Sequence, residues 1–225
     1  MRSLLRLAVL GGLILGAAQV ASAQSHTFTF EGLTDEGWGG AFNDDAGRTN
    51  PIVNIGGSNR MQVSNTDGFQ ETAVASGTGS SFFNAMAAAA ANPAGYELAY
   101  DWYVDTTGAS GATFLQFGSY VNTGSSYYAQ NFPGTGKEVE LNGTQLASGQ
   151  TFSGSVTVPF TAYGSIPAGE TFLRLGLIEN SGTGALVPGI YFDNISIRPI
   201  PEPASLAMLG LGVSALALRR RGRTA

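Results

Sequence analysis

The chain has 225 residues, of which only 12% are charged, and it contains 32 glycines and no cysteine. This length suits one domain with processing segments at its ends, and the lack of cysteine excludes disulfides and thiolate chemistry. Residues 24–200 hold five basic and fifteen acidic side chains. Such a surface repels phosphate, so nucleic acid is not an expected partner, and it suits hydrated polysaccharide or divalent cations better.

The first residues have the order of an export signal. Arg2 and Arg6 precede an apolar stretch at 7–18, and the small residues Ala21-Ser22-Ala23 form a cleavage site. This pattern predicts a signal peptide at residues 1–23, cut after Ala23. The single histidine, His26, then lies near the new N-terminus, where we expect a solvated residue rather than a catalytic one.

Residues 24–199 form the predicted domain, and their pattern is one of short strands separated by turns. The segment "YELAYDWYVD" alternates over 96–105, which places Tyr96, Leu98, Tyr100, Trp102 and Val104 on one face and favours core packing for Trp102. Turn residues recur at close spacing, which is typical of an all-β, antiparallel β-sandwich. The other expected strands are 26–30, 60–65, 68–74, 113–122, 125–132, 153–160, 170–180 and 189–199.

Two segments are less regular. The alanine run in "SFFNAMAAAAANPAGY" favours a helix but meets Asn92-Pro93, so we expect one short helical turn or an irregular crossover. The segment "KEVELNGTQLA" (137–147) predicts a β-hairpin, because Asn142-Gly143 suits the positive φ angles of a type I′ turn.

The C-terminal end consists of three parts in a fixed order. Pro201-Glu202-Pro203 comes first, an apolar run of fifteen residues follows at 204–218, and Arg219, Arg220 and Arg221 come next. As a helix the run spans about 22 Å, short of the roughly 30 Å hydrocarbon core of a bilayer. The basic cluster would stop it on the cytoplasmic side.

This order resembles the PEP-CTERM sorting signal, over residues 200–225. The resemblance implies a protein of a Gram-negative bacterium that makes exopolysaccharide. It also implies processing near the Pro-Glu-Pro motif by an exosortase, a membrane enzyme. The chain would be held transiently at the inner membrane by a short hydrophobic helix, and then released to, or fixed at, the cell surface or the extracellular matrix.

The body resembles the jelly-roll sandwiches of galactose-binding-like and carbohydrate-binding modules. The motifs are "TFTFEGL", "YELAYDWYVD", "GETFLRLGLIEN" and "GIYFDNISI". The resemblance implies that the first and last strands lie side by side. It also implies a structural Ca²⁺ held by Glu31 and Asp193.

Asp193 is conspicuous for a separate reason. Strict alternation puts it on one face with Tyr191, Ile195 and Ile197. A carboxylate on an apolar face is costly unless it is paired. The alternatives to a cation are that Asp193 caps a turn or pairs with Arg60 or Arg174.

Sugar recognition needs exposed aromatic rings, and the candidates are Trp38, Tyr127 and Tyr128. The motifs of a catalytic serine, a zinc-binding histidine pair or a phosphate loop are absent from the sequence, so we do not expect an enzyme. We predict non-catalytic binding of extracellular polysaccharide. The alternative is a matrix or surface-layer component acting through protein–protein contacts. A glycoside hydrolase using Asp44/Asp45 or Asp101/Asp105 is a remote alternative.

Overall fold

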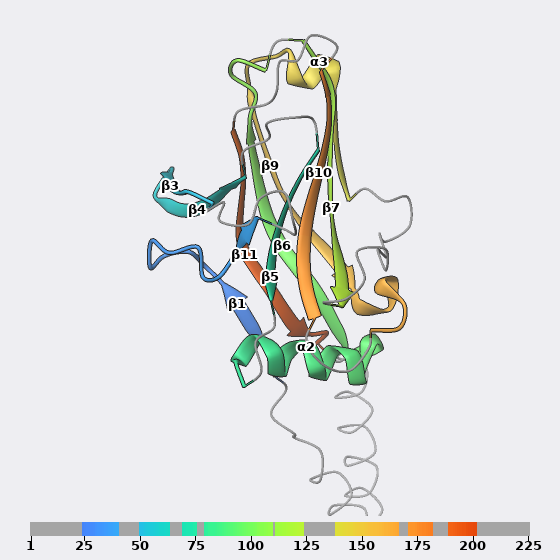
Figure 1. Ribbon diagram of the computed structural model, residues 1–225. Helices are drawn as coiled ribbons and strands as arrows, with labels where there is room; N and C mark the ends of the chain where they lie inside the picture. The colour runs from blue at the N-terminus through green and yellow to red at the C-terminus, as the bar shows by residue number, and fades with distance from the viewer. Residues whose placement is uncertain are drawn as a thin grey trace, which may run out of the picture.

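The computed structural model describes residues 24–40, 50–63, 69–75, 79–109, 111–123, 138–166, 171–181 and 189–201. Within them, two antiparallel sheets pack face to face (Figure 1). The prediction of an all-β, jelly-roll-like antiparallel sandwich is confirmed. Across these same residues, no helix is long and apolar enough to cross a membrane.

Each sheet draws its strands from distant parts of the sequence. The first sheet has the order β3 (Ile52–Ile55), β4 (Ser58–Val63), β11 (Gly189–Pro199), β6 (Tyr96–Asp105) and β9 (Thr151–Pro159), and β1 (His26–Phe28) also pairs with β11. The second sheet has the order β2 (Gly39–Gly40), β5 (Phe69–Ala75), β10 (Thr171–Ser181), β7 (Ala112–Thr123) and β8 (Val139–Asn142).

Aromatic and aliphatic side chains from the two inner faces form the core. Phe192 of the first sheet meets Phe117 of the second edge to face, with ring centroids 5.4 Å apart. Tyr100 also packs edge to face on Phe192, with ring centroids 5.8 Å apart. Such edge-to-face pairs add to the stabilisation that burial provides. A cysteine-free domain is therefore held by its core, as its composition requires.

The first and last strands lie side by side, as expected. β1 pairs antiparallel with β11, and Phe28 is opposite Ile195. A short helix, α2 (Ser81–Ala91), lies across the same end of the sandwich (Figure 1). The Nδ1 atom of His26 lies 2.8 Å from the Ser81 hydroxyl, so His26 is hydrogen-bonded and half-buried.

Two local expectations are wrong. The alanine run forms the eleven-residue helix α2, longer than one turn, because alanine favours a helix at each position of the run. The Ser80 side chain caps its start by accepting from the Phe83 N–H at 2.9 Å. Asn142-Gly143 does not form a hairpin. Instead Asn142 caps α3 (Gly143–Leu146) in a capping box with Gln145, and both hydrogen bonds are 3.0 Å long. Side-chain bonds to the backbone outcompeted the turn here.

The strands β2 and β3 were not expected, and the strand expected at 125–132 lies outside the described residues. The signal peptide at 1–23 and the tail beyond residue 201 also lie outside them, so these domain boundaries stay predictions.

A cluster of hydrogen-bonded polar side chains lies between the two sheets. Glu138, directly before β8, accepts hydrogen bonds from the Tyr100 hydroxyl and from the Ser119 N–H (3.0 Å) and hydroxyl (2.5 Å). The Ser119 hydroxyl also lies 2.6 Å from that of Tyr163. We call Tyr100, Ser119, Glu138 and Tyr163 the inner cluster. It joins β6 of the first sheet to β7 of the second.

Candidate functional site

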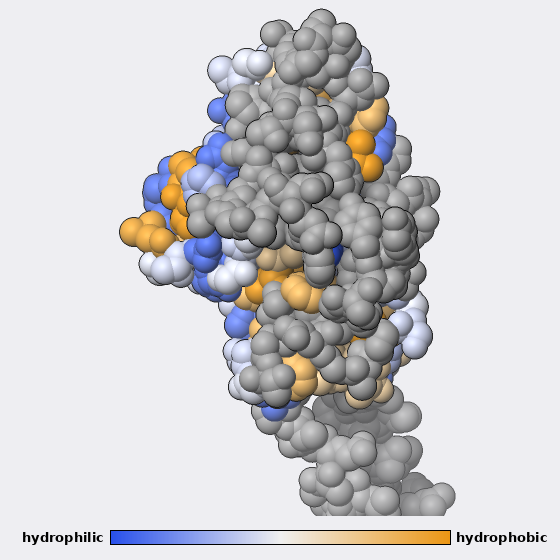
Figure 2. All heavy atoms as spheres, viewed as in Figure 1, coloured by the Kyte–Doolittle hydropathy of each residue, from blue (hydrophilic) through white to orange (hydrophobic). Residues whose placement is uncertain are grey.

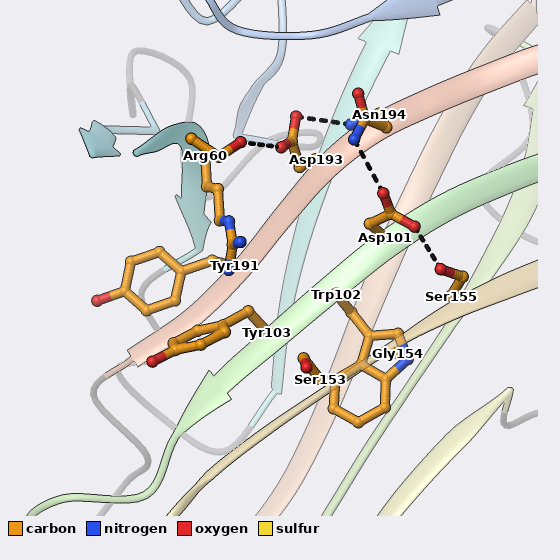
Figure 3. Close-up of a pocket in the computed structure, with 11 residues that line it drawn as sticks. Arg60, Asp101, Trp102, Tyr103, Ser153, Gly154, Ser155, Tyr191, Asp193 and Asn194 are labelled. Atoms are coloured by element: carbon orange, nitrogen blue, oxygen red, sulfur yellow. Dashed lines mark hydrogen bonds between the residues drawn. The ribbon is translucent and has the colours of Figure 1, made fainter. Parts of the chain in front are cut away.

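A pocket of about 290 Å³ opens on the outer face of the first sheet, the face turned away from the second sheet (Figure 3). Four strands line it. Its residues are Ser58 and Arg60 from β4, Asp101, Trp102 and Tyr103 from β6, Ser153, Gly154 and Ser155 from β9, and Tyr191, Asp193 and Asn194 from β11.

Strand register explains why these side chains meet. Asp193 pairs with Asp101, which pairs with Ser155, and two residues along, Tyr191 pairs with Tyr103. Directly opposed residues in antiparallel strands project to the same side of the sheet. The outer face therefore carries two adjacent rows of side chains. One row consists of Asp193, Asp101 and Ser155, and the other consists of Tyr191, Tyr103 and Ser153.

A β-bulge sets which face of β11 is outside. The register with β6 shifts between Asp193 and Ser196, and Asn194 adopts a positive φ of 49°. Ile190 and Phe192 are buried before the bulge, and Ile195 and Ile197 after it. The expectation that Asp193 shares a face with Ile195 and Ile197 is thus wrong, because the extra residue reverses the alternation.

Asp193 is only 5% exposed but well supplied with donors. Its Oδ2 atom accepts from the Ser58 hydroxyl at 2.6 Å, and its Oδ1 accepts from the Asn194 N–H at 2.7 Å. Burial raises the pKa of the Asp193 carboxyl, while these hydrogen bonds and the charge of Arg60 oppose the rise.

Asn194 links this carboxylate to the next one. Its Nδ2 donates to Asp101 Oδ2 at 2.9 Å, and the Ser155 hydroxyl donates to the other oxygen of Asp101 at 2.5 Å. We call Ser58, Asp101, Ser155, Asp193 and Asn194 the outer cluster. The chain of bonds, drawn as dashed lines in Figure 3, holds the cluster in one arrangement.

The two tyrosines form the second part of the site, and we call them the tyrosine pair. Tyr103 and Tyr191 meet edge to face at 5.8 Å, and the Arg60 guanidinium carbon lies 4.8 Å from the Tyr103 ring centroid. Both rings are partly exposed. A Cβ atom on Gly189 would lie 3.1 Å from a Tyr191 ring carbon, so a glycine there leaves room for the ring.

Trp102 has a different role. It packs edge to face on the core residue Phe117 at 5.5 Å and lies against Gly154, where a Cβ would be 3.0 Å from the indole. This agrees with the core packing predicted for it.

The aromatic residues predicted to stack on sugar rings are Trp38, Tyr127 and Tyr128. Trp38 is 1% exposed and packs on Phe28 at 5.4 Å, so its ring offers no face to a sugar. The expectation for Trp38 is therefore corrected, because a glycine-rich loop did not leave the ring in solvent. Tyr127 and Tyr128 lie outside the described residues.

The two predicted calcium ligands accept hydrogen bonds from neighbouring residues of β4, Asn59 and Ser58. Glu31 is exposed and accepts from Asn59 Nδ2 at 3.1 Å, while Asp193 accepts from Ser58. Within the described ranges no group of three acidic or histidine side chains is placed to hold a metal ion. The hydrogen bonds from Ser58 and Asn194, together with the charge of Arg60, already stabilise the Asp193 carboxylate. The calcium site stays a prediction.

The sequence analysis did not predict the tyrosine pair or the hydrogen-bonded link between Asp101 and Asp193. The alternation of Asp101 and Tyr103 with the core residues of β6 indicates that both side chains face away from the core. The pairing of Asp193 with Asp101 needs the strand register, which the sequence does not state.

Comparisons with known proteins found similar solved structures. Among solved structures, the chain is similar to the N-terminal tandem CBM22 domains of Xyn10C from Paenibacillus barcinonensis, with 11% identity and a TM-score of 0.45; the match covers 78% of this chain and 50% of that one. The chain thus spans half of that structure.

Two further similarities are of the same kind. A xylan-binding module CBM15 matches with 9% identity and a TM-score of 0.44, covering 80% of this chain and 98% of that one. The K3 cleaved adhesin domain of Lys-gingipain from Porphyromonas gingivalis matches with 14% identity and a TM-score of 0.41, covering 77% and 98%. No curated protein matches the chain.

The molecule is thus an antiparallel, jelly-roll-like β-sandwich. Residues 199–221 match the family described as the PEP-CTERM protein-sorting motif. The chain carries this sorting motif, which implies an exported protein and processing by an exosortase.

Proposed function

We propose that the outer face of the first sheet binds extracellular polysaccharide without cleaving it. The observation that carries the proposal is the tyrosine pair beside the outer cluster on one exposed sheet face. Ligand sites commonly combine aromatic surface with a few convergent polar groups. Here the rings offer apolar faces for sugar rings, and the cluster offers carboxylate and amide groups for hydroxyls.

The hydrogen bonds of the outer cluster support binding for a further reason. Asp101 and Asp193 are already oriented by Ser58, Ser155 and Asn194. A ligand therefore does not have to order them, which lowers the entropic cost of association.

In the cell, the protein would bind exopolysaccharide after export, at the cell surface or in the extracellular matrix. Before processing it would be held briefly at the inner membrane by its C-terminal segment. The predicted motif order and the acidic body both suit this route.

Affinity electrophoresis tests the proposal. Gels containing a neutral glycan, hydroxyethylcellulose or mannan, should retard the protein, whereas polygalacturonate should not, because its charge matches that of the outer cluster. Tyr191→Ala should weaken the retarding affinity about tenfold, a loss of roughly 1.4 kcal/mol. Tyr191→Phe is the matched control and should keep most of the affinity because it keeps the ring.

Other results would contradict the proposal. If no neutral glycan retards the protein, or if Tyr191→Ala behaves as the parent does, the tyrosine pair is not a sugar platform. New reducing ends after incubation with the retarding glycan would indicate a hydrolase. Self-association that rises with concentration in the absence of glycan would favour the matrix alternative.

A further inference from the structure

The chain leaves the folded body at a fixed place. Pro199 is the last residue of β11 in register with β6, opposite Tyr96. The N–H of Ile200 then donates to the Gly95 carbonyl at 2.8 Å, in the turn that directly follows α2. The body therefore holds the chain up to residue 200, beside α2.

The apolar segment begins very soon after this point. Only Pro201, Glu202 and Pro203 separate Ile200 from Ala204, the first residue of the run. Four Cα–Cα steps span about 14 Å at full extension. While the run is in a bilayer, the α2 end of the body is therefore held within about 14 Å of it, little more than the diameter of one helix.

The surface at this end differs in charge from the rest of the acidic body. Residues 79–96 contain no charged side chain. The exposed positions of α2 lie along one face, spaced three and four apart, and are Ser81, Asn84, Ala87 and Ala91. In Figure 2 the coloured residues at the lower end, where Figure 1 places α2, range from blue through pale to orange.

The charges that border this surface cancel. Glu97 and Arg198, the neighbours of Tyr96 and Pro199 in their strands, form an ion pair of 2.8 Å. An acidic surface would be repelled by anionic lipid. Among the described residues, α2 with its bordering pair Glu97 and Arg198 carries no net charge. Both the tether and the charge pattern thus select this end for contact with a membrane.

We propose that, in the unprocessed protein, the exposed face of α2 lies against the lipid headgroups. The short tether keeps the local concentration of lipid high, so a weak contact is enough to orient the body. The strands then run away from the membrane, and the outer face of the first sheet stays open. Removal of the tail abolishes the contact.

Site-specific labelling tests this orientation, and the cysteine-free chain makes it simple. The full chain is exported in a host without exosortase, purified with its tail and placed in vesicles of phosphatidylethanolamine and phosphatidylglycerol that contain headgroup-nitroxide lipid. A fluorophore on Ala87→Cys or Ala91→Cys should lose most of its emission. The matched control is Ala147→Cys, exposed at the opposite end after α3, which should keep its emission.

A charge variant gives a second readout. With the label on Ala91→Cys, Ala87→Glu should reduce the quenching in vesicles rich in phosphatidylglycerol, while Ala147→Glu should leave it unchanged. Equal quenching at all three positions, or none at Ala87 and Ala91, overturns the proposal. Quenching that needs added exosortase also overturns it and assigns the surface to the enzyme.

Discussion

The inner and outer clusters are built from the same kinds of side chain but have different surroundings. Both surround carboxylates with serine hydroxyls, and both have tyrosines at hand. The inner cluster lies between the sheets, with Ser119 and Tyr163 almost fully buried. The outer cluster lies on an open face, where Asn194 is exposed and Asp101 is partly exposed. Which side of a strand a residue faces therefore decides whether a carboxylate lies in the core or stays accessible to a ligand.

The largest expected difference is in stability. Glu138→Ala leaves the Tyr100 hydroxyl without its acceptor in the core, and we expect a loss of about 3 kcal/mol in the free energy of unfolding. Asp101→Ala, in the outer cluster, should cost about 1 kcal/mol because water replaces the lost partner. Urea unfolding of the two variants measures both values. Equal losses would show that the two clusters do not differ as described.

The pH dependence of stability should separate the clusters further. Burial raises the pKa of the Glu138 carboxyl above its ordinary value of 4.5, although hydrogen bonds from Ser119 and Tyr100 oppose the rise. The protonated form is thus favoured in the folded state. This contribution is fully present below pH 4.5 and is lost as the pH rises through the raised pKa.

Thermal unfolding across that pH range is the measurement. Glu138→Gln cannot ionise, so its Tm relative to the parent should improve as the pH rises from 4.5 towards neutrality. Asp193 also has a raised pKa and remains in both proteins, so the difference isolates Glu138. A Tm difference that does not change with pH would contradict the assignment.

The smallest expected effect concerns the predicted calcium site. If Glu31 and Asp193 bind the ion, adding EDTA should lower stability by about 1 kcal/mol, the linkage expected when free calcium is a few times its Kd. Glu31→Gln should remove the response to EDTA, and Glu97→Gln, at an ion pair elsewhere, should keep it. An unchanged Tm on chelation of the parent protein would end the calcium prediction.

The strand pattern was readable because it depends on local alternation. The segments 96–105 and 189–199 were expected with the bounds that β6 and β11 have in the structure. The prediction of a hairpin at Asn142-Gly143 is wrong because an asparagine that favours a hairpin turn can also cap a helix. Gln145, three residues later, completes a capping box with Asn142 and so favours the helix. Short strands such as β2, with two residues, carry too little pattern to be seen.

The site was less predictable than the fold because it depends on long-range register. Asp193 was singled out correctly as a carboxylate that needs partners, but the bulge at Asn194 turned it to the outer face. Ser58 becomes a partner only because β4 lies beside β11, and the Asn194 N–H becomes one only because of the bulge. Burial of Trp38 likewise depends on its packing against Phe28, which the loop composition does not reveal.

The position of β11 has a mechanical consequence. It is an interior strand, bonded to β6 on one side and to β4 and β1 on the other. Tyr191, Asp193 and Asn194 belong to it, and the match to the sorting motif begins at its last residue, Pro199. A force applied between a ligand on the outer face and an attachment beyond Pro199 therefore acts along β11. Extraction of β11 requires the hydrogen bonds on both of its sides to break together in shear.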